Sequence, residues 1–369
     1  MVAAAAIGWT GFATSAQELD LAPLPPLPAL PKWDRVISGR FGVGYRDNVL
    51  RATTAPQGST FLLSGAELFV SRLPVDGTQF DFIVTGDLIS YFHKQAVPTE
   101  STAFAQTTLK REWNADWQTA LTLEGFYQDQ VLDVSTTDPT LGRIKVQGET
   151  LIARPGVRRN VLRSSWVTVE FSAARQYYLA PLDDYWEGGP RITLGQAYGN
   201  KSEVTLSYEA PFATYDTATQ LAADGTPSPG TRRRLLQHDA RLTWRHHWDE
   251  SRHWRTTTKL GLKHSQDNGS GYLDFDRAQI SEQIRFRNDH WELTGTTKFS
   301  YYHYPVQTVS AADLRHREQT DLALNLRVER HFGGSIKLFV EYDREQTFSN
   351  VPSDRYTMNT VSGGLNFEF

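Results

Sequence analysis

Apolar and polar residues alternate along most of the chain after residue 35. The pattern is clear in the apolar set Phe80, Phe82, Val84 and Leu88 and the polar set Gln79, Asp81, Thr85 and Asp87. A period of two predicts a β-strand with one apolar and one polar face. About sixteen such stretches follow one another between turn signals. They are expected near Ile37–Tyr45, Leu62–Val70, Phe80–Leu88, Ala103–Arg111, Trp117–Val131, Ile144–Arg154, Trp166–Tyr177, Arg191–Tyr198, Glu203–Phe212, Leu236–Trp248, Trp254–His264, Ala278–Arg287, Trp291–His303, Leu322–Val328, Ile336–Tyr342 and Ser353–Phe369.

The connections between these stretches are short and long in turn. The short ones are Pro74–Thr78, Glu112–Asp116, Arg159–Arg163, Gly199–Ser202, Asp249–His253, Asn288–His290 and Phe332–Ser335. The long ones are Asn48–Ser59, His93–Ser101, Asp133–Gly142, Ala180–Gly189, Ala213–Arg233, Ser265–Phe275, Tyr304–Glu318 and Gln346–Asp354. Short periplasmic turns opposite long outer loops are typical of outer-membrane barrels, and a sandwich with Greek-key crossings has no reason for this parity. We therefore predict an all-β fold over residues 35–369, a closed antiparallel up-and-down transmembrane barrel of about 16 strands.

The last stretch carries Val361, Leu365, Phe367 and Phe369 on one face. It resembles the closing strand of Gram-negative outer-membrane β-barrels, which ends in an aromatic residue. By this resemblance Phe367 and Phe369 form the signal that the barrel-assembly machinery reads. The alternative is an edge strand of a soluble sandwich. In a barrel this strand has to pair with Ile37–Tyr45, because an open edge in lipid would leave backbone groups unpaired.

The start of the chain differs from the rest. Residues 1–16 form a small-residue apolar run that ends near Ala16 and is similar to a signal peptide, although no Lys or Arg precedes it. Residues 17–34 are rich in proline, which favours an extended polyproline segment over helix or strand. We interpret them as a periplasmic spacer.

Composition excludes several classes of protein. The net charge of -4 gives no sign of a nucleic-acid partner, and the absence of Cys excludes disulfides and thiolate sites. Mean hydropathy is -0.46 and no run of about 18 apolar residues occurs, which excludes helical membrane spans. Strands that face lipid with alternate residues only would escape that test.

Aromatic residues make up 12% of the chain and gather at the ends of the expected strands. Trp113, Trp117, Trp248, Trp254 and Trp291 flank short turns, where a periplasmic interfacial girdle belongs. The rings at the long-loop ends are Tyr45, Tyr91, Phe92, Tyr127, Tyr177, Tyr178, Tyr301, Tyr302 and Tyr304. We expect these to form the outer girdle.

Charged residues occupy many of the alternate, inward positions. A charge in mid-membrane hydrocarbon costs about 2–4 kcal/mol, so these residues indicate a water-filled lumen. The pore-lining candidates are Arg40, Asp81, Asp87, Glu124, Arg241, Arg245, Lys259, Lys263, Arg285, Arg287, Lys298, Arg327 and Lys337. Basic residues dominate between residues 241 and 298, and acidic residues dominate the first strands. As a hypothesis, this asymmetry gives a mild anion preference; the alternative is that the charges pair across strands and only stiffen the wall.

No catalytic, metal or cofactor site is predicted. His246 and His247 would point to opposite faces of a strand, and so would Ser300 and His303. The segment Gln266–Gly271 lacks the carboxylate that closes a calcium loop. A lipid-face hydrolase and a metal site are therefore both worse explanations of these residues than a channel.

The segment Gly42-Val-Gly-Tyr-Arg-Asp-Asn-Val-Leu-Arg51 resembles the first-strand motif of β-barrel porin families with a Gly-Tyr-x-x-Asn-Val pattern. Some of these accompany exopolysaccharide export, and barrel domains of surface-lipoprotein assembly modifiers open similarly. The function expected is a porin-like channel in the Gram-negative outer membrane for small polar or charged solutes, with saccharides among the candidates. The alternative is a non-conducting barrel, either an assembly or secretion partner or a surface structural protein. Expected partners are outer-membrane lipids and lipopolysaccharide, the assembly machinery, and a polar solute or polysaccharide.

Overall fold

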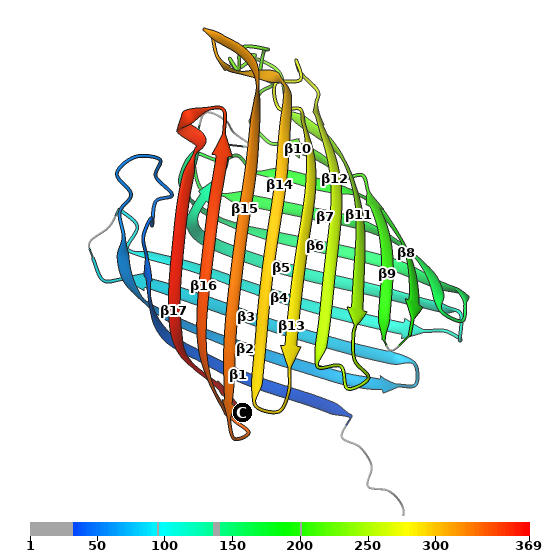
Figure 1. The fold of residues 1–369 in the computed structure, drawn as a ribbon. Coiled ribbons are helices and arrows are strands. Elements are labelled where there is room, and N and C mark those ends of the chain that lie inside the picture. Colours follow the sequence, from blue (N-terminus) through cyan, green and yellow to red (C-terminus); the bar gives the residue numbers. More distant parts are fainter. Residues whose placement is uncertain (1–31, 94–95, 136–140, 200) are drawn as a thin grey trace, which may run out of the picture. The chain divides into compact units, whose positions relative to one another are not determined.

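The structure is a computed structural model that describes residues 32–93, 96–135, 141–199 and 201–369. The expected signal-peptide-like segment 1–16 and residues 17–31 of the expected spacer lie outside the described residues. Within the described part, the chain forms strands throughout (Figure 1). Their bounds are β1 Trp33–Arg46, β2 Ser59–Val75, β3 Thr78–Tyr91, β4 Thr99–Glu112, β5 Trp117–Asp133, β6 Arg143–Leu162, β7 Ser165–Tyr178, β8 Tyr185–Tyr198, β9 Ser202–Glu209, β10 Phe212–Tyr215, β11 Arg234–His247, β12 Trp254–Asp267, β13 Phe275–Arg287, β14 Trp291–Ser310, β15 Asp313–Phe332, β16 Ile336–Ser349 and β17 Tyr356–Glu368. A single-turn 3-10 helix, Pro352–Asp354, precedes β17.

The strands close into a barrel. Consecutive strands pair antiparallel, except β9 with β10, and β17 pairs with β1, with Ser38 opposite Glu368 and Arg46 opposite Thr360. β9 and β10 run end to end between β8 and β11, because Pro211 has no N–H to continue the ladder. The predicted fold, a closed antiparallel barrel of 16 strands, is confirmed. The predicted pairing of the last strand with the first is confirmed as well.

The predicted alternation of short turns and long loops holds, with one error. At the short-turn end, for example, Asp76 and Gly77 both have positive φ, as a two-residue hairpin turn requires. The predicted long loop Tyr304–Glu318 is wrong, since β14 continues to Ser310 and β15 starts at Asp313. The pairing shifts between His303 and Thr308, and this irregularity accommodates Pro305, which has no N–H to donate to the ladder. In Figure 1 this hairpin rises above the neighbouring strands.

The outer face of the barrel is apolar. Outward residues such as Val43, Leu151 and Leu262 are 57%, 56% and 66% exposed. A band of exposed aliphatic side chains around a closed sheet is stable only against lipid, so the barrel lies in a membrane. Among the described residues, no helix is both long and apolar enough to cross a bilayer.

The tryptophans that flank the short turns are exposed, and their membrane-interface role stays a prediction. Trp113, Trp117, Trp248, Trp254 and Trp291 are all exposed at the short-turn end, at 65%, 42%, 62%, 46% and 39%. Guanidinium groups lie over three of these rings, 5.7 Å from the centroid for Arg111 on Trp113. Indole rings beside cations suit a headgroup interface.

The predicted outer girdle is only partly right. Tyr45, Tyr127, Tyr177 and Tyr301 lie on outward positions. Tyr91, Tyr178, Tyr302 and Tyr304 instead lie on inward positions, because the strands keep their parity up to the loops. Tyr304 is completely buried. These inward rings help to build the lumen.

Candidate functional site

The predicted pore-lining residues all occupy inward positions, and most have ion-pair partners. On the acidic side, Asp87 lies 2.5 Å from Arg40, Glu124 lies 2.6 Å from Arg154 and Asp81 lies 3.8 Å from Lys110. On the basic side the pairs are Arg241–Asp239 at 3.5 Å, Arg245–Glu203 at 2.9 Å, Arg285–Glu292 at 2.6 Å, Arg287–Glu292 at 3.8 Å, Arg327–Glu341 at 2.7 Å and Lys337–Glu368 at 2.9 Å. Apart from Arg241 and Asp239, which lie two positions apart on β11, these pairs join different strands, as the alternative interpretation expected.

Four cations lack such partners among the described residues, on the side of the barrel where basic residues dominate, here called the basic wall (residues 241–298). Within the described part of the chain, Arg255, Lys259, Lys263 and Lys298 have no carboxylate at ion-pair distance. They lie on β12 and β14, on inward positions. Lys263 instead lies 5.9 Å from the centroid of the Phe275 ring. This part of the wall keeps an excess of positive charge.

The two walls meet around a cavity of about 630 Å³ near the short-turn end. It lies between β1–β3 and β13–β17, and charges of both signs line it. The basic side chains are Arg40, Arg285, Arg287, Arg327 and Lys337, and the acidic ones are Glu67, Asp87, Glu292, Glu329 and Glu368. Such a cavity favours water and polar solutes over apolar ones, because apolar solutes would leave these charges without hydration.

One group beside this cavity has the spacing of metal ligands. Glu292, Glu329 and His331 place ligand atoms within 4.8 Å of one another. The carboxylates already bind guanidinium groups, since Arg285 contacts Glu292 and Arg327 contacts Glu329, each at 2.6 Å. A metal ion would have to displace these cations, so we assign none here.

At the long-loop end, the first loop folds into the lumen. Val49 from loop 47–58 is completely buried against Phe61, Tyr91, Val131 and Phe339. The rings of Phe61 and Phe339 fit in the lumen because β1 carries glycine residues next to them. A Cβ atom at Gly44 would collide with the Phe61 ring, and one at Gly42 would lie 3.1 Å from the Phe339 ring. The two glycines of the first-strand motif thus make room for side chains that fill the lumen.

Contacts between opposite walls span the same end of the lumen. Arg317 of β15 is 4% exposed and pairs with Asp354 at 3.0 Å. It also donates a hydrogen bond of 3.2 Å to the carbonyl oxygen of Ser135, which follows β5 on the far side of the barrel. Arg51 of the first loop pairs with Glu345 of β16 at 3.0 Å and donates to the carbonyl oxygen of Val131. The mouth is therefore bridged by side chains rather than open across its width.

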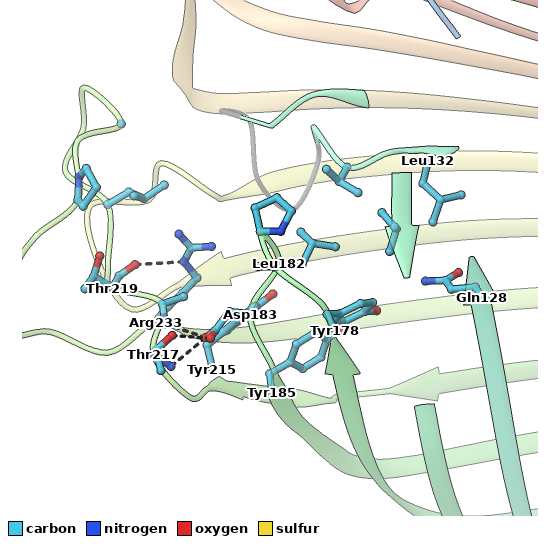
Figure 2. A pocket seen from close by; sticks show the side chains of 18 residues that line it. Gln128, Leu132, Tyr178, Leu182, Asp183, Tyr185, Tyr215, Thr217, Thr219 and Arg233 are labelled. Atoms are coloured by element: carbon cyan, nitrogen blue, oxygen red, sulfur yellow. Dashed lines mark hydrogen bonds between the residues drawn. The ribbon is translucent and has the colours of Figure 1, made fainter. Parts of the chain in front are cut away.

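A second cavity, of about 590 Å³, lies beside this bridge (Figure 2). Tyr178, Tyr185 and Tyr215 form a column in its wall, with ring centroids 6.3 Å and 4.7 Å apart. The Arg233 guanidinium lies 5.4 Å from the Tyr215 centroid. Leu132 and Leu182 add apolar surface. Sequence reasoning missed this cavity, although the inward parity of the three tyrosines could have indicated it.

The β10–β11 loop, residues 216–233, forms one side of the cavity and is tied down. The Asp183 carboxylate accepts hydrogen bonds from the N–H groups of Thr217 and Ala218, at 2.9 and 2.7 Å (Figure 2). Arg175 donates to Asp216, and this hydrogen bond holds the pKa of the Asp216 carboxyl below its usual range. These hydrogen bonds hold the β10–β11 loop against the inner wall of the barrel.

The histidines that sequence analysis set aside are separated as expected. His246 stacks on Tyr198 on the outer face, with ring centroids 5.9 Å apart. Ser300 is buried on an inward position and His303 lies on an outward one. The prediction that opposite parity keeps Ser300 and His303 apart is confirmed.

Comparison with solved structures bears on the fold. The chain is similar to OccAB1 of Acinetobacter baumannii, with a TM-score of 0.51 and 12% identity over 91% of this chain and 96% of that chain. It is similar to a BenF-like porin from Pseudomonas fluorescens Pf-5, with a TM-score of 0.50 and 8% identity over 91% of this chain and 99% of that chain. The chain has the fold of outer-membrane porins. No protein-family model matches the chain, and no curated protein matches it. At these identities the likeness establishes the porin fold alone.

Proposed function

We propose that the chain is a channel in the Gram-negative outer membrane that passes small polar or charged solutes through an aqueous lumen. The observation that carries this proposal is the cavity of about 630 Å³ ringed by Arg, Lys, Asp and Glu side chains inside the barrel. A 16-strand barrel is also too wide for its own strand side chains to fill. The partners are then outer-membrane lipids and lipopolysaccharide, and the assembly machinery that reads Phe367 and Phe369.

The unpaired cations give the channel a mild preference for anions. Arg255, Lys259, Lys263 and Lys298 add positive potential on β12 and β14, and ion pairs neutralise most other charges on that wall. Solutes with a carboxylate or phosphate group are favoured by such a field. Saccharide or polysaccharide cargo stays a prediction.

A second candidate function rests on the bridged mouth. Arg317, Arg51 and the buried Val49 tie loops to opposite walls at the long-loop end. If these contacts persist, the barrel does not conduct and serves as an assembly or secretion partner or as a surface structure.

Conductance of the purified full chain in planar bilayers separates the two functions. The channel predicts stepwise ohmic currents, and the second candidate predicts none. Under a salt gradient, the reversal potential of the channel should indicate chloride over potassium. Lys259→Gln should reduce this preference, whereas Lys145→Gln on the outer face should not. A cation preference in the unmodified chain would contradict the assigned selectivity.

A further inference from the structure

The cavity of about 590 Å³ beside the bridged mouth combines apolar walls with a few polar groups. Leu132, Val134, Val146, Leu182 and Leu221 line it, together with the three rings of the tyrosine column. Pockets of about 300–1,000 Å³ with such a lining commonly enclose a small organic molecule, which the polar groups orient. The charged side chains among the lining residues are those of Arg233 and Asp183.

Arg233 is buried and held in place from three sides. Its side chain is 7% exposed, although it directly precedes β11 in a loop. Its backbone N–H donates to the carbonyl oxygen of Ala218 at 2.8 Å, and its own carbonyl oxygen accepts from the N–H of Tyr215 at 3.2 Å. Its Nε donates to the carbonyl oxygen of Thr219 at 3.2 Å (Figure 2). Nη1 and Nη2 donate to no described residue, so the end of a fixed guanidinium is left for a ligand.

The charge of Arg233 also lacks an opposite charge nearby. Within the described residues, no carboxylate lies at ion-pair distance from this guanidinium, which lies beside the Tyr215 ring. The other buried arginines of this end are paired, Arg175 with Asp216 at 2.5 Å and Arg317 with Asp354 at 3.0 Å. A buried charge without a partner costs free energy, which an anionic ligand would recover.

Asp183 does not supply the missing partner. Its carboxylate accepts hydrogen bonds from the N–H groups of Thr217 and Ala218 and from the Thr217 hydroxyl, at 2.9, 2.7 and 2.5 Å (Figure 2). Three donors of the β10–β11 loop thus compensate this carboxylate, which lies beyond ion-pair distance from Arg233. The negative charge in the lining is occupied with holding the loop, whereas the positive charge is available.

We propose that this cavity binds a small organic carboxylate with an apolar body. The carboxylate oxygens accept hydrogen bonds from Nη1 and Nη2 of Arg233, because two parallel N–H donors match the two oxygens of a carboxylate. The apolar body lies against Leu132, Leu182 and the tyrosine column. The inference deepens the proposed channel function by naming a class of solute, and it rests on that function for the role of the bound ligand as cargo.

Isothermal titration calorimetry of the full chain in neutral detergent tests the site, with protein-free micelles as the blank. The probes are phenylpropionate, the uncharged phenylpropionamide, acetate, which has the charge without the body, and phenylalanine, which adds an ammonium group. Arg233→Gln removes the charge from the cavity. The matched control is Arg232→Gln, because the Arg232 guanidinium also donates to backbone carbonyl oxygens, those of Tyr215 and Asp216, but does not line the cavity.

We expect phenylpropionate to bind the unmodified chain at least tenfold more tightly than phenylpropionamide or acetate, since a hydrogen-bonded charge and apolar burial each contribute that much. Arg233→Gln should bind phenylpropionate about tenfold more weakly, and Arg232→Gln should bind it unchanged. Circular dichroism verifies that both variants have folded, and the comparison of probes on the unmodified chain decides even if Arg233→Gln does not fold.

Equal binding of phenylpropionate and phenylpropionamide would overturn the proposal, and so would equal losses in Arg233→Gln and Arg232→Gln. Tighter binding of phenylalanine than of phenylpropionate would overturn the assignment of Asp183 to the loop alone, because its carboxylate would then take the ammonium group. Binding is measured without any current. Failure of the site with intact conductance would therefore overturn this inference alone, and binding without conductance would overturn the channel function alone.

Discussion

At the short-turn end of the lumen, charged side chains meet across neighbouring strands, whereas at the long-loop end side chains from opposite walls meet through inward-folded loops. Arg285–Glu292 and Arg327–Glu341 are typical of the first kind, with 14 positions between the partners of the second pair. Arg317–Ser135 is typical of the second kind, and so is Arg51, which contacts both Glu345 of β16 and Val131 of β5. The difference assigns separate roles in a channel. In the proposed channel, we expect the charges of the short-turn cavity to add to the field of the cations on β12 and β14, and the long-loop end to limit the passage of solute.

The largest effect is expected from breaking the bridge across the mouth. Arg317→Ala leaves Asp354 without its partner and Ser135 without its hydrogen bond, so the free energy of unfolding should fall by about 3–5 kcal/mol. Conductance should rise at the same time. Urea-induced unfolding in lipid vesicles and bilayer currents measure the two effects.

The matched control for this change is two positions away. Arg315 also pairs with a carboxylate, Asp313 at 2.6 Å, but its side chain is 75% exposed. Arg315→Ala should change neither stability nor conductance measurably. Equal effects of the two substitutions would show that the mouth is not held by Arg317.

The next effect concerns the loop packed in the lumen. Gly44→Ala places a Cβ atom against the Phe61 ring, and the displaced ring should disturb the packing of Val49. We expect a loss of about 1–3 kcal/mol in unfolding free energy. Gly39 has no atom within 4 Å of the corresponding position, so Gly39→Ala should be neutral or slightly stabilising. If Gly39→Ala were also destabilised, lost backbone freedom rather than a collision with the Phe61 ring would explain the lower stability of Gly44→Ala.

A smaller effect is expected at the short-turn end. Glu292→Gln removes the partner of Arg285 and Arg287, which adds positive charge to the cavity. The reversal potential under a salt gradient should shift toward chloride, with little change in single-channel conductance. Glu149→Gln makes the same change on an exposed outer position and should leave the reversal potential unaltered. A shift in both variants would point to surface charge rather than the lumen.

The smallest effect is expected in the β10–β11 loop. Asp216→Asn weakens the tie to Arg175 and should increase trypsin cleavage within Arg232–Arg234. Asp224→Asn, in the same loop, changes a carboxylate that bonds only Thr226 among the described residues and should not. The pKa of the Asp216 carboxyl is lowered in the folded chain. The stabilisation that this carboxylate gives to the loop is therefore complete above the ordinary Asp pKa of about 3.9, and it is lost as the pH falls through the lowered pKa. Cleavage that rose between about pH 8 and pH 6 would contradict this assignment.

The barrel itself could be predicted from the sequence because the patterns that specify it are local along the chain. A period of two fixes which face each side chain takes, and the lengths of connections fix the direction of each strand. Arg40 and Lys298 could be placed on inward positions in this way.

The loops could not be predicted by the same rules. Nothing in the spacing around Val49 or Ser135 says that these residues fold inward, because their partners Phe339 and Arg317 are distant in the sequence. The loop predicted over Tyr304–Glu318 is instead a hairpin, in which an irregular pairing accommodates Pro305 within β14. The place of Tyr178 near a loop predicts a position in the outer girdle, although its parity directs the side chain inward. Counting parity through the ends of the strands would have corrected that assignment.

The central claim is that charged, water-filled space inside this barrel conducts small solutes. Currents through the purified full chain in a planar bilayer under a potassium chloride gradient test it most directly. The account predicts discrete ohmic steps with a reversal potential on the chloride side. An absence of steps in both the unmodified chain and Arg317→Ala would contradict it.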